Sequence, residues 1–187
     1  MGRLIYLMNV SLDGFVETPE HSLDWTVVDD ELHAWFNDRE RESEVDLYGR
    51  RLWEVMSSHW PTGESDPDAT EAMREFARIW NATQKVVFST KLESVGHGAR
   101  LARGDVGEQL AKLREEFSGD MEVGGPTLAA QFIERGLVDV YRLVVHPVIL
   151  GAGKPFFPPR ASPIALRHTE SRTFASGVVY LGYEAVR

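Results

Sequence analysis

The stretch MEVGGPTLAAQFIERGLVDV, residues 121–140, decides the fold. Residues 121–123 predict a short strand, and residues 127–135 predict a helix that Gly136 ends. A second apolar run predicts a long strand over residues 138–149. Two adjacent glycines, Gly124 and Gly125, separate the first strand from the helix. Such a pair indicates that something approaches the backbone closely at this point.

The same alternation of strands and helices continues on both sides of this stretch. Strands are expected at residues 3–10, 45–49 and 84–90, within 95–105, and near 164–171 and 178–186. Helices are expected at residues 29–42, 50–56, 69–80 and 106–117, and loops at 59–68 and 151–159. The order predicts one α/β domain over residues 1–187, a three-layer fold. Its mixed sheet is mostly parallel with antiparallel C-terminal strands, and helices cover both faces.

The composition excludes several classes of protein. The chain has 187 residues, of which 43% are hydrophobic and 26% charged, and its net charge of -9 argues against a nucleic-acid partner. No apolar run reaches the roughly 18 residues that a membrane span needs, and the segment before Asp13 is too short for a secretory signal. We therefore expect a cytoplasmic protein. The absence of cysteine excludes disulfides and thiolate zinc sites.

The six histidines are scattered along the chain and predict no metal site. His146 stands at the end of an apolar strand, before Pro147, and is interpreted as a hydrogen-bonded core residue. The sequence GAGKP at residues 151–155 lacks the first glycine and the final Ser or Thr of a phosphate-binding P-loop. It is interpreted as a tight loop after a strand.

Three strand ends contain residues suited to binding a phosphate-rich nucleotide. They are Gly49 with Arg50, then Ser89, Thr90 and Lys91, and finally the glycine pair. Ligands of open α/β sheets bind beyond the carboxyl ends of the strands, and free N–H groups at helix N-termini attract phosphate. Each of these turns is, taken singly, more often structural. Together they favour a nucleotide site.

Four segments place this pattern in a family: SLDGFVE (residues 11–17), GRRLWE (49–54), VVFSTK (86–91) and the block from residue 122 to 157. With them the chain resembles the dihydrofolate reductase-like superfamily, and in particular the reductase domain at the C-terminal end of bacterial riboflavin-pathway RibD proteins. The resemblance covers nearly the whole chain. It implies an NADPH cofactor lying across the three strand ends.

The resemblance also implies roles for individual residues. The pyrophosphate would rest on Gly124, Gly125, Thr127 and Leu128, with Gly49, Arg50 and Arg51 facing the phosphates. Ser89, Thr90 and Lys91 match the family's segment around the adenosine 2′-phosphate, which favours NADPH over NADH. Leu52 departs from the family pattern, because a threonine usually follows the Gly-Arg pair.

Two carboxylates, Asp13 and Glu31, are candidate catalytic residues. Asp13 matches an acidic residue near the reaction centre of the riboflavin-type members. Glu31 loosely matches the substrate-facing carboxylate of the folate enzyme, with a first-turn acid of a helix as the alternative. A carboxylate in such a pocket holds an amide and amine or helps relay a proton.

The resemblance implies an NADPH-dependent reductase that transfers hydride to a carbonyl or imine of a small pyrimidine- or pterin-like substrate. One candidate is the 5-amino-6-(5-phosphoribosylamino)uracil reductase type of riboflavin biosynthesis. The alternatives are a dihydrofolate reductase, which SLDGFV in the opening segment disfavours, and a catalytically inactive NADPH-binding protein. By analogy with the family we also expect a homodimer, in which the strand at 138–149 and the terminal strands form part of the interface.

Overall fold

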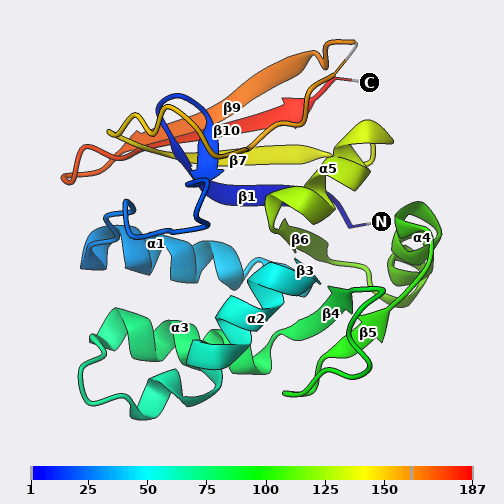
Figure 1. Ribbon diagram of the computed structural model, residues 1–187. Coiled ribbons are helices and arrows are strands. Elements are labelled where there is room, and N and C mark those ends of the chain that lie inside the picture. Colours follow the sequence, from blue (N-terminus) through cyan, green and yellow to red (C-terminus); the bar gives the residue numbers. More distant parts are fainter. Residues whose placement is uncertain (1, 161, 187) are drawn as a thin grey trace.

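An eight-stranded sheet organises the chain, in the order β5-β4-β3-β6-β1-β7-β10-β9 (Figure 1). The computed structural model describes residues 2–160 and 162–186. From β5 to β7 neighbouring strands are parallel, and β10 is antiparallel to both β7 and β9. The mostly parallel sheet with antiparallel C-terminal strands is therefore confirmed. The strands are β1 (Leu4–Ser11), β3 (Ser43–Gly49), β4 (Gln84–Phe88), β5 (Arg100–Ala102), β6 (Asp120–Gly124), β7 (Val140–His146), β9 (Leu166–Thr173) and β10 (Val179–Ala185).

Helices cover both faces of the sheet, as predicted (Figure 1). Successive side chains of a strand point to opposite faces, so β1 separates two layers. Its Leu7 packs in a cluster with α1, whereas its Tyr6 packs in a cluster with α4 and α5. The aromatic side chains of α2 and α3 pack on Tyr48 of β3. The helices are α1 (Asp30–Glu40), α2 (Arg50–His59), α3 (Glu71–Ala82), α4 (Val106–Glu116) and α5 (Pro126–Glu134).

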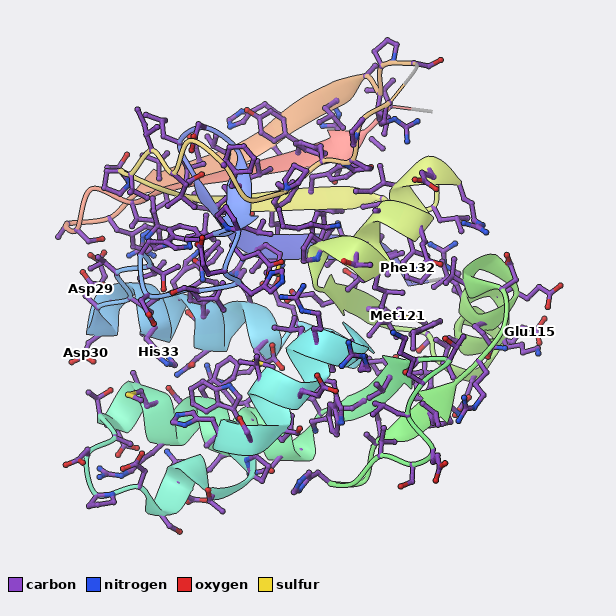
Figure 2. The ribbon with its side chains drawn as sticks, in the orientation of Figure 1. Asp29, Asp30, His33, Glu115, Met121 and Phe132 are labelled. Atoms are coloured by element: carbon purple, nitrogen blue, oxygen red, sulfur yellow. The ribbon has the colours of Figure 1, made fainter. Side chains whose placement is uncertain are left out.

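The helix of the deciding stretch packs directly on the strands beside it. Phe132 of α5 and Met121 of β6 are both fully enclosed in the larger core cluster, and Figure 2 shows them between helix and sheet. Burying a large apolar side chain contributes about 1.5–3 kcal/mol, so this contact orients α5 on the sheet. As a result, the start of α5 is held at the end of β6.

Three details differ from the sequence-based expectation. β7 ends at His146, before Pro147, because proline has no N–H group to donate to a strand pair. The loop expected at 151–159 contains β8 (Lys154–Pro155), which pairs antiparallel with β2 (Phe15–Glu17). The loop expected at 59–68 contains the 3-10 helix η1 (Trp60–Ser65). Strands of two or three residues contain no periodic pattern, so the sequence did not predict the β2–β8 pair.

All the described helices are short compared with a membrane-spanning helix, which needs about 20 residues. α3, with 12 residues, is the longest described helix, and no helix in the described ranges has the length and apolar character needed to cross a bilayer.

Candidate functional site

A pocket of about 650 Å³ lies at the carboxyl edge of the parallel strands. It runs from the ends of β4 and β5, at one edge of the sheet, to β1 and β2. Nine of the ten cofactor residues predicted from the sequence line it: Gly49, Arg50, Arg51, Ser89, Thr90, Lys91, Gly125, Thr127 and Leu128. The tenth, Gly124, is not in the lining itself but lies next to Leu52, which is. The fold therefore brings the three predicted strand ends into one site.

Two of the five α-helices in the described part of the chain begin at this pocket, and both lack a capping side chain. α1, α3 and α4 are capped by Asp29, Thr70 and Asp105, whose side chains accept first-turn N–H groups; Figure 2 shows Asp29 at the start of α1. α2 and α5 begin instead after glycines, with no capping side chain and no acidic residue in the first turn. Their first-turn N–H groups have no intrahelical partner. Two positive helix ends therefore converge on the pocket, an arrangement that favours binding of an anion.

The glycine pair has a steric reason at each position. Gly125, which precedes α5, has a φ of +94°, a conformation that side-chain-bearing residues rarely adopt. A Cβ atom on Gly124 would lie 2.6 Å from Cδ2 of Leu52, which itself lines the pocket. Gly125 thus allows the turn, and Gly124 makes room for Leu52. The turn at Gly125 and the space at Gly124 both leave room for a phosphate group beside the two glycines.

The end of the pocket at β4 and β5 is basic. The Ser89 hydroxyl accepts the backbone N–H groups of Lys91 and Leu92, both at 3.1 Å, and so shapes the turn. Arg103 lies beside this turn and donates to the carbonyl oxygens of Ser89, at 3.4 Å, and of Leu92. Among the ion pairs of the described residues, none involves Lys91 or Arg103. Sequence reasoning missed Arg103 because it follows a strand of only three residues.

The two arginines at the start of α2 are already paired with carboxylates. Nη1 of Arg50 lies 2.8 and 2.9 Å from the two carboxylate oxygens of Glu54, one helical turn away. Nη2 of Arg51 lies 2.9 Å from Oε2 of Glu17 in β2. Both carboxylates line the pocket, and neither was predicted from the sequence.

The two predicted catalytic carboxylates lie outside the pocket lining. Asp13 accepts hydrogen bonds from the Ser11 hydroxyl at 2.7 Å and from the N–H groups of Leu150 and Gly151. Glu31 accepts from Ala175 and from the Arg172 side chain, at the β9–β10 turn. These hydrogen bonds lower the pKa of each carboxyl, chiefly the bond from Ser11 for Asp13 and from the Ala175 N–H for Glu31. Both residues hold loops in place, and their catalytic roles stay predictions.

His146, the last residue of β7, is buried and makes polar contacts. Its Nε2 lies 2.9 Å from the side-chain oxygen of Asn9, and its Nδ1 accepts the N–H of Val27 at 3.3 Å. Burial lowers the pKa of the imidazole, so the neutral form donates from Nε2 to Asn9. The interpretation of His146 as a hydrogen-bonded core residue is confirmed by these contacts.

Comparison with known proteins identifies a protein family and several structures with a similar fold. The family model described as the RibD C-terminal domain matches residues 3–180. The uncharacterized protein YyaP of Bacillus subtilis is 35% identical over 182 residues, which cover 97% of this chain and 94% of YyaP. A putative riboflavin biosynthesis protein from Shewanella sp. PV-4 superposes with a TM-score of 0.77 at 19% identity, covering 99% of each chain.

A dihydrofolate reductase from Enterococcus faecalis, solved in complex with NADP(H) and RAB-propyl, superposes with a TM-score of 0.66 at 15% identity. The match covers 100% of this chain and 98% of that enzyme. At such identities the two structural likenesses show a shared fold. The fold is therefore the three-layer dihydrofolate reductase-like α/β architecture expected from the sequence.

Proposed function

The chain belongs to the RibD C-terminal domain family, and from this membership we propose that it is an NADPH-dependent reductase. The observation that carries the proposal is the convergence of two uncapped helix N-termini on one pocket, at α2 and α5. Such termini hold a diphosphate with backbone N–H groups. The proposed substrate is a small pyrimidine- or pterin-like molecule with a reducible carbonyl or imine.

We propose the placement of the two ends of the cofactor from the order of the strands. Lys91, Ser89 and Arg103 form the basic end at β4 and β5, which suits the adenosine 2′-phosphate. The nicotinamide would then lie at the opposite end, where Met8 and Val16 give an apolar lining. The bound nicotinamide would supply the hydride. The residues of this chain would hold its phosphates, orient its ring and keep water from the reacting carbon.

Measuring NADPH oxidation against panels of carbonyl, pterin and pyrimidine substrates tests the proposal. The panels include the phosphoribosylamino-uracil intermediate of riboflavin biosynthesis and dihydrofolate. Saturable turnover of any of them supports a reductase, and turnover of dihydrofolate in preference to the others favours the folate alternative. NADPH binding without turnover favours the binding-only alternative. Failure to bind NADPH at millimolar concentration contradicts the proposal.

Replacing Lys91 by alanine is expected to weaken NADPH binding by about tenfold to a hundredfold. A hydrogen bond to a charged group contributes about 1.5–3 kcal/mol, and each 1.4 kcal/mol is a factor of ten in affinity. NADH has no 2′-phosphate, so its binding is expected to change little. Fluorescence titrations with both cofactors measure the difference. Lys112→Ala, on the exposed side of α4, is the matched control, and equal losses for NADPH and NADH contradict the assignment.

We further propose a homodimer formed through β7 and the terminal strands. Val145 and Leu143 lie beside Val179 and Leu181 on one face of these strands, and all four are only half-buried. β9, at the edge of the sheet, is exposed along its whole length. Sedimentation at micromolar concentration is expected to give twice the 21.1 kDa of one chain. A mass of one chain contradicts the dimer, and Leu181→Glu is expected to produce that mass.

A further inference from the structure

The end of the pocket at β1 and β2 contains a carboxylate, Glu17, whose side chain is 13% exposed. Its Oε2 accepts from Arg51 at 2.9 Å, and its Oε1 lies 3.0 Å from Nδ1 of His21. Met8 of β1 and Val16 of β2 are the apolar side chains at this end, and Leu23 and Val55 add further apolar lining to the pocket. Of the two carboxylates that line the pocket, Glu54 pairs with Arg50 at the start of α2, whereas Glu17 lies in β2, at the end where the proposed cofactor would place its nicotinamide.

The backbone holds Glu17 in a defined position. Glu17 pairs with Lys154 of β8, and the neighbouring Val16 is buried with 1% of its surface exposed. A Cβ atom on Gly153 would lie 2.0 Å from the carbonyl oxygen of Glu17, so the 151–155 loop closes tightly on this residue. A carboxylate on such a support is preorganised for recognition of a ligand.

The hydrogen-bonding capacity of Glu17 is only partly used. An ionised carboxylate has about four lone-pair positions, and the two contacts to Arg51 and His21 occupy two of them. The remaining positions suit N–H donors of a ligand. At the same time Glu17 neutralises Arg51, the nearest permanent cation, which would otherwise attract an anionic substrate.

We propose that Glu17 determines substrate specificity in this pocket, selecting a neutral or basic nitrogen ring with adjacent N–H donors over a ring that carries a carboxylate or phosphate at this end. This inference rests on the proposed function and narrows its substrate class. A ring with N–H donors gains charge-assisted hydrogen bonds to Glu17. An anionic group on the ligand is repelled by the negative charge of Glu17. To bind Arg51 it must also break the Glu17–Arg51 ion pair, so the pocket discriminates against an anionic ligand.

Two pyrimidine probes of opposite character test the inference on the NADPH-saturated protein. 2,4-Diaminopyrimidine offers N–H donors, and orotate carries a carboxylate on a similar ring. The wild type is expected to bind 2,4-diaminopyrimidine more tightly than orotate by calorimetry. In Glu17→Gln the affinity for 2,4-diaminopyrimidine is expected to fall about tenfold to a hundredfold, while that for orotate rises.

Two further variants separate recognition from structure. Glu20→Gln removes the same charge from the exposed turn that follows β2, outside the pocket lining, and is expected to leave the affinity ratio unchanged. Arg51→Gln breaks the ion pair but keeps the carboxylate, so the preference for 2,4-diaminopyrimidine is expected to persist. The inference is overturned if Glu17→Gln keeps the wild-type ratio, if Arg51→Gln reproduces its loss, or if the wild type binds neither probe. Failure of NADPH to bind counts against the proposed function alone, because the same probe comparison is then made on the cofactor-free protein.

Discussion

Gly124→Ala is expected to lose NADPH affinity by tenfold or more while the protein without cofactor melts nearly as the wild type does. The new Cβ atom would lie 2.6 Å from Cδ2 of Leu52, the flexible tip of a side chain that lines the pocket. Leu52 relieves the clash by moving, and the space open to it is the site proposed for the diphosphate. A cofactor titration beside a thermal melt measures both effects.

Gly125→Ala is the matched comparison, with the opposite pattern expected. Its φ of +94° strains a residue with a side chain, at a cost of roughly 1–3 kcal/mol, so the melting temperature is expected to fall by about 3–10 °C. Leu52→Ala combined with Gly124→Ala is expected to restore NADPH binding, because it removes the displaced side chain. If Gly124→Ala instead lowers the melting temperature and the surviving folded protein binds NADPH normally, the pair serves only the turn.

The stability of the protein is expected to fall as the pH rises from about 5 to 8, and Glu122→Gln is expected to remove much of that loss. Glu122 lies beside Asp46 in the strand register, and Asp46 lies beside Lys85. Burial, and then repulsion by Asp46, raise the pKa of Glu122 to about 8. The pKa of Glu40 is also raised, by burial and by Asp46.

The sign of this pH dependence follows from the number of protons bound in the folded and the unfolded state. The folded pKa of Glu122 lies above the ordinary value of 4.5, so between these values the folded protein retains a proton that the unfolded chain has released. This contribution is complete below the unfolded pKa and is lost as the pH rises through 8. Each pH unit in that window costs up to about 1.4 kcal/mol for one group.

Urea unfolding of the wild type and Glu122→Gln at pH 5, 6, 7 and 8 measures the effect. The variant is expected to be more stable than the wild type at pH 8, by about 1 kcal/mol or more, and to have a shallower pH dependence. Glu134→Gln, at the exposed end of α5, is the control with the same change of charge. Parallel pH curves for the wild type and Glu122→Gln would falsify this origin of the pH dependence.

Much of the fold could be predicted because its elements have local signals. The apolar runs gave the long strands, Gly136 marked the end of α5 with a φ of +65°, and acidic residues marked the start of α1. The position of the pocket could be predicted from one further rule, namely that parallel strands present their carboxyl ends at the same edge of a sheet. That rule brought Arg50, Lys91 and Gly125 together correctly, although they are far apart in the sequence.

The sequence by itself determined the alternation of elements, the parallel sheet and the three strand ends that form the pocket, because periodicity and glycine positions are local properties of the chain. Only the tertiary structure decided which charged groups meet there. Glu17 contacts Arg51 because two very short strands pair, and Asp13 binds the 150–151 backbone because β1 and β7 end side by side. Such contacts depend on strand register and on the packing of distant segments, and no local pattern encodes them.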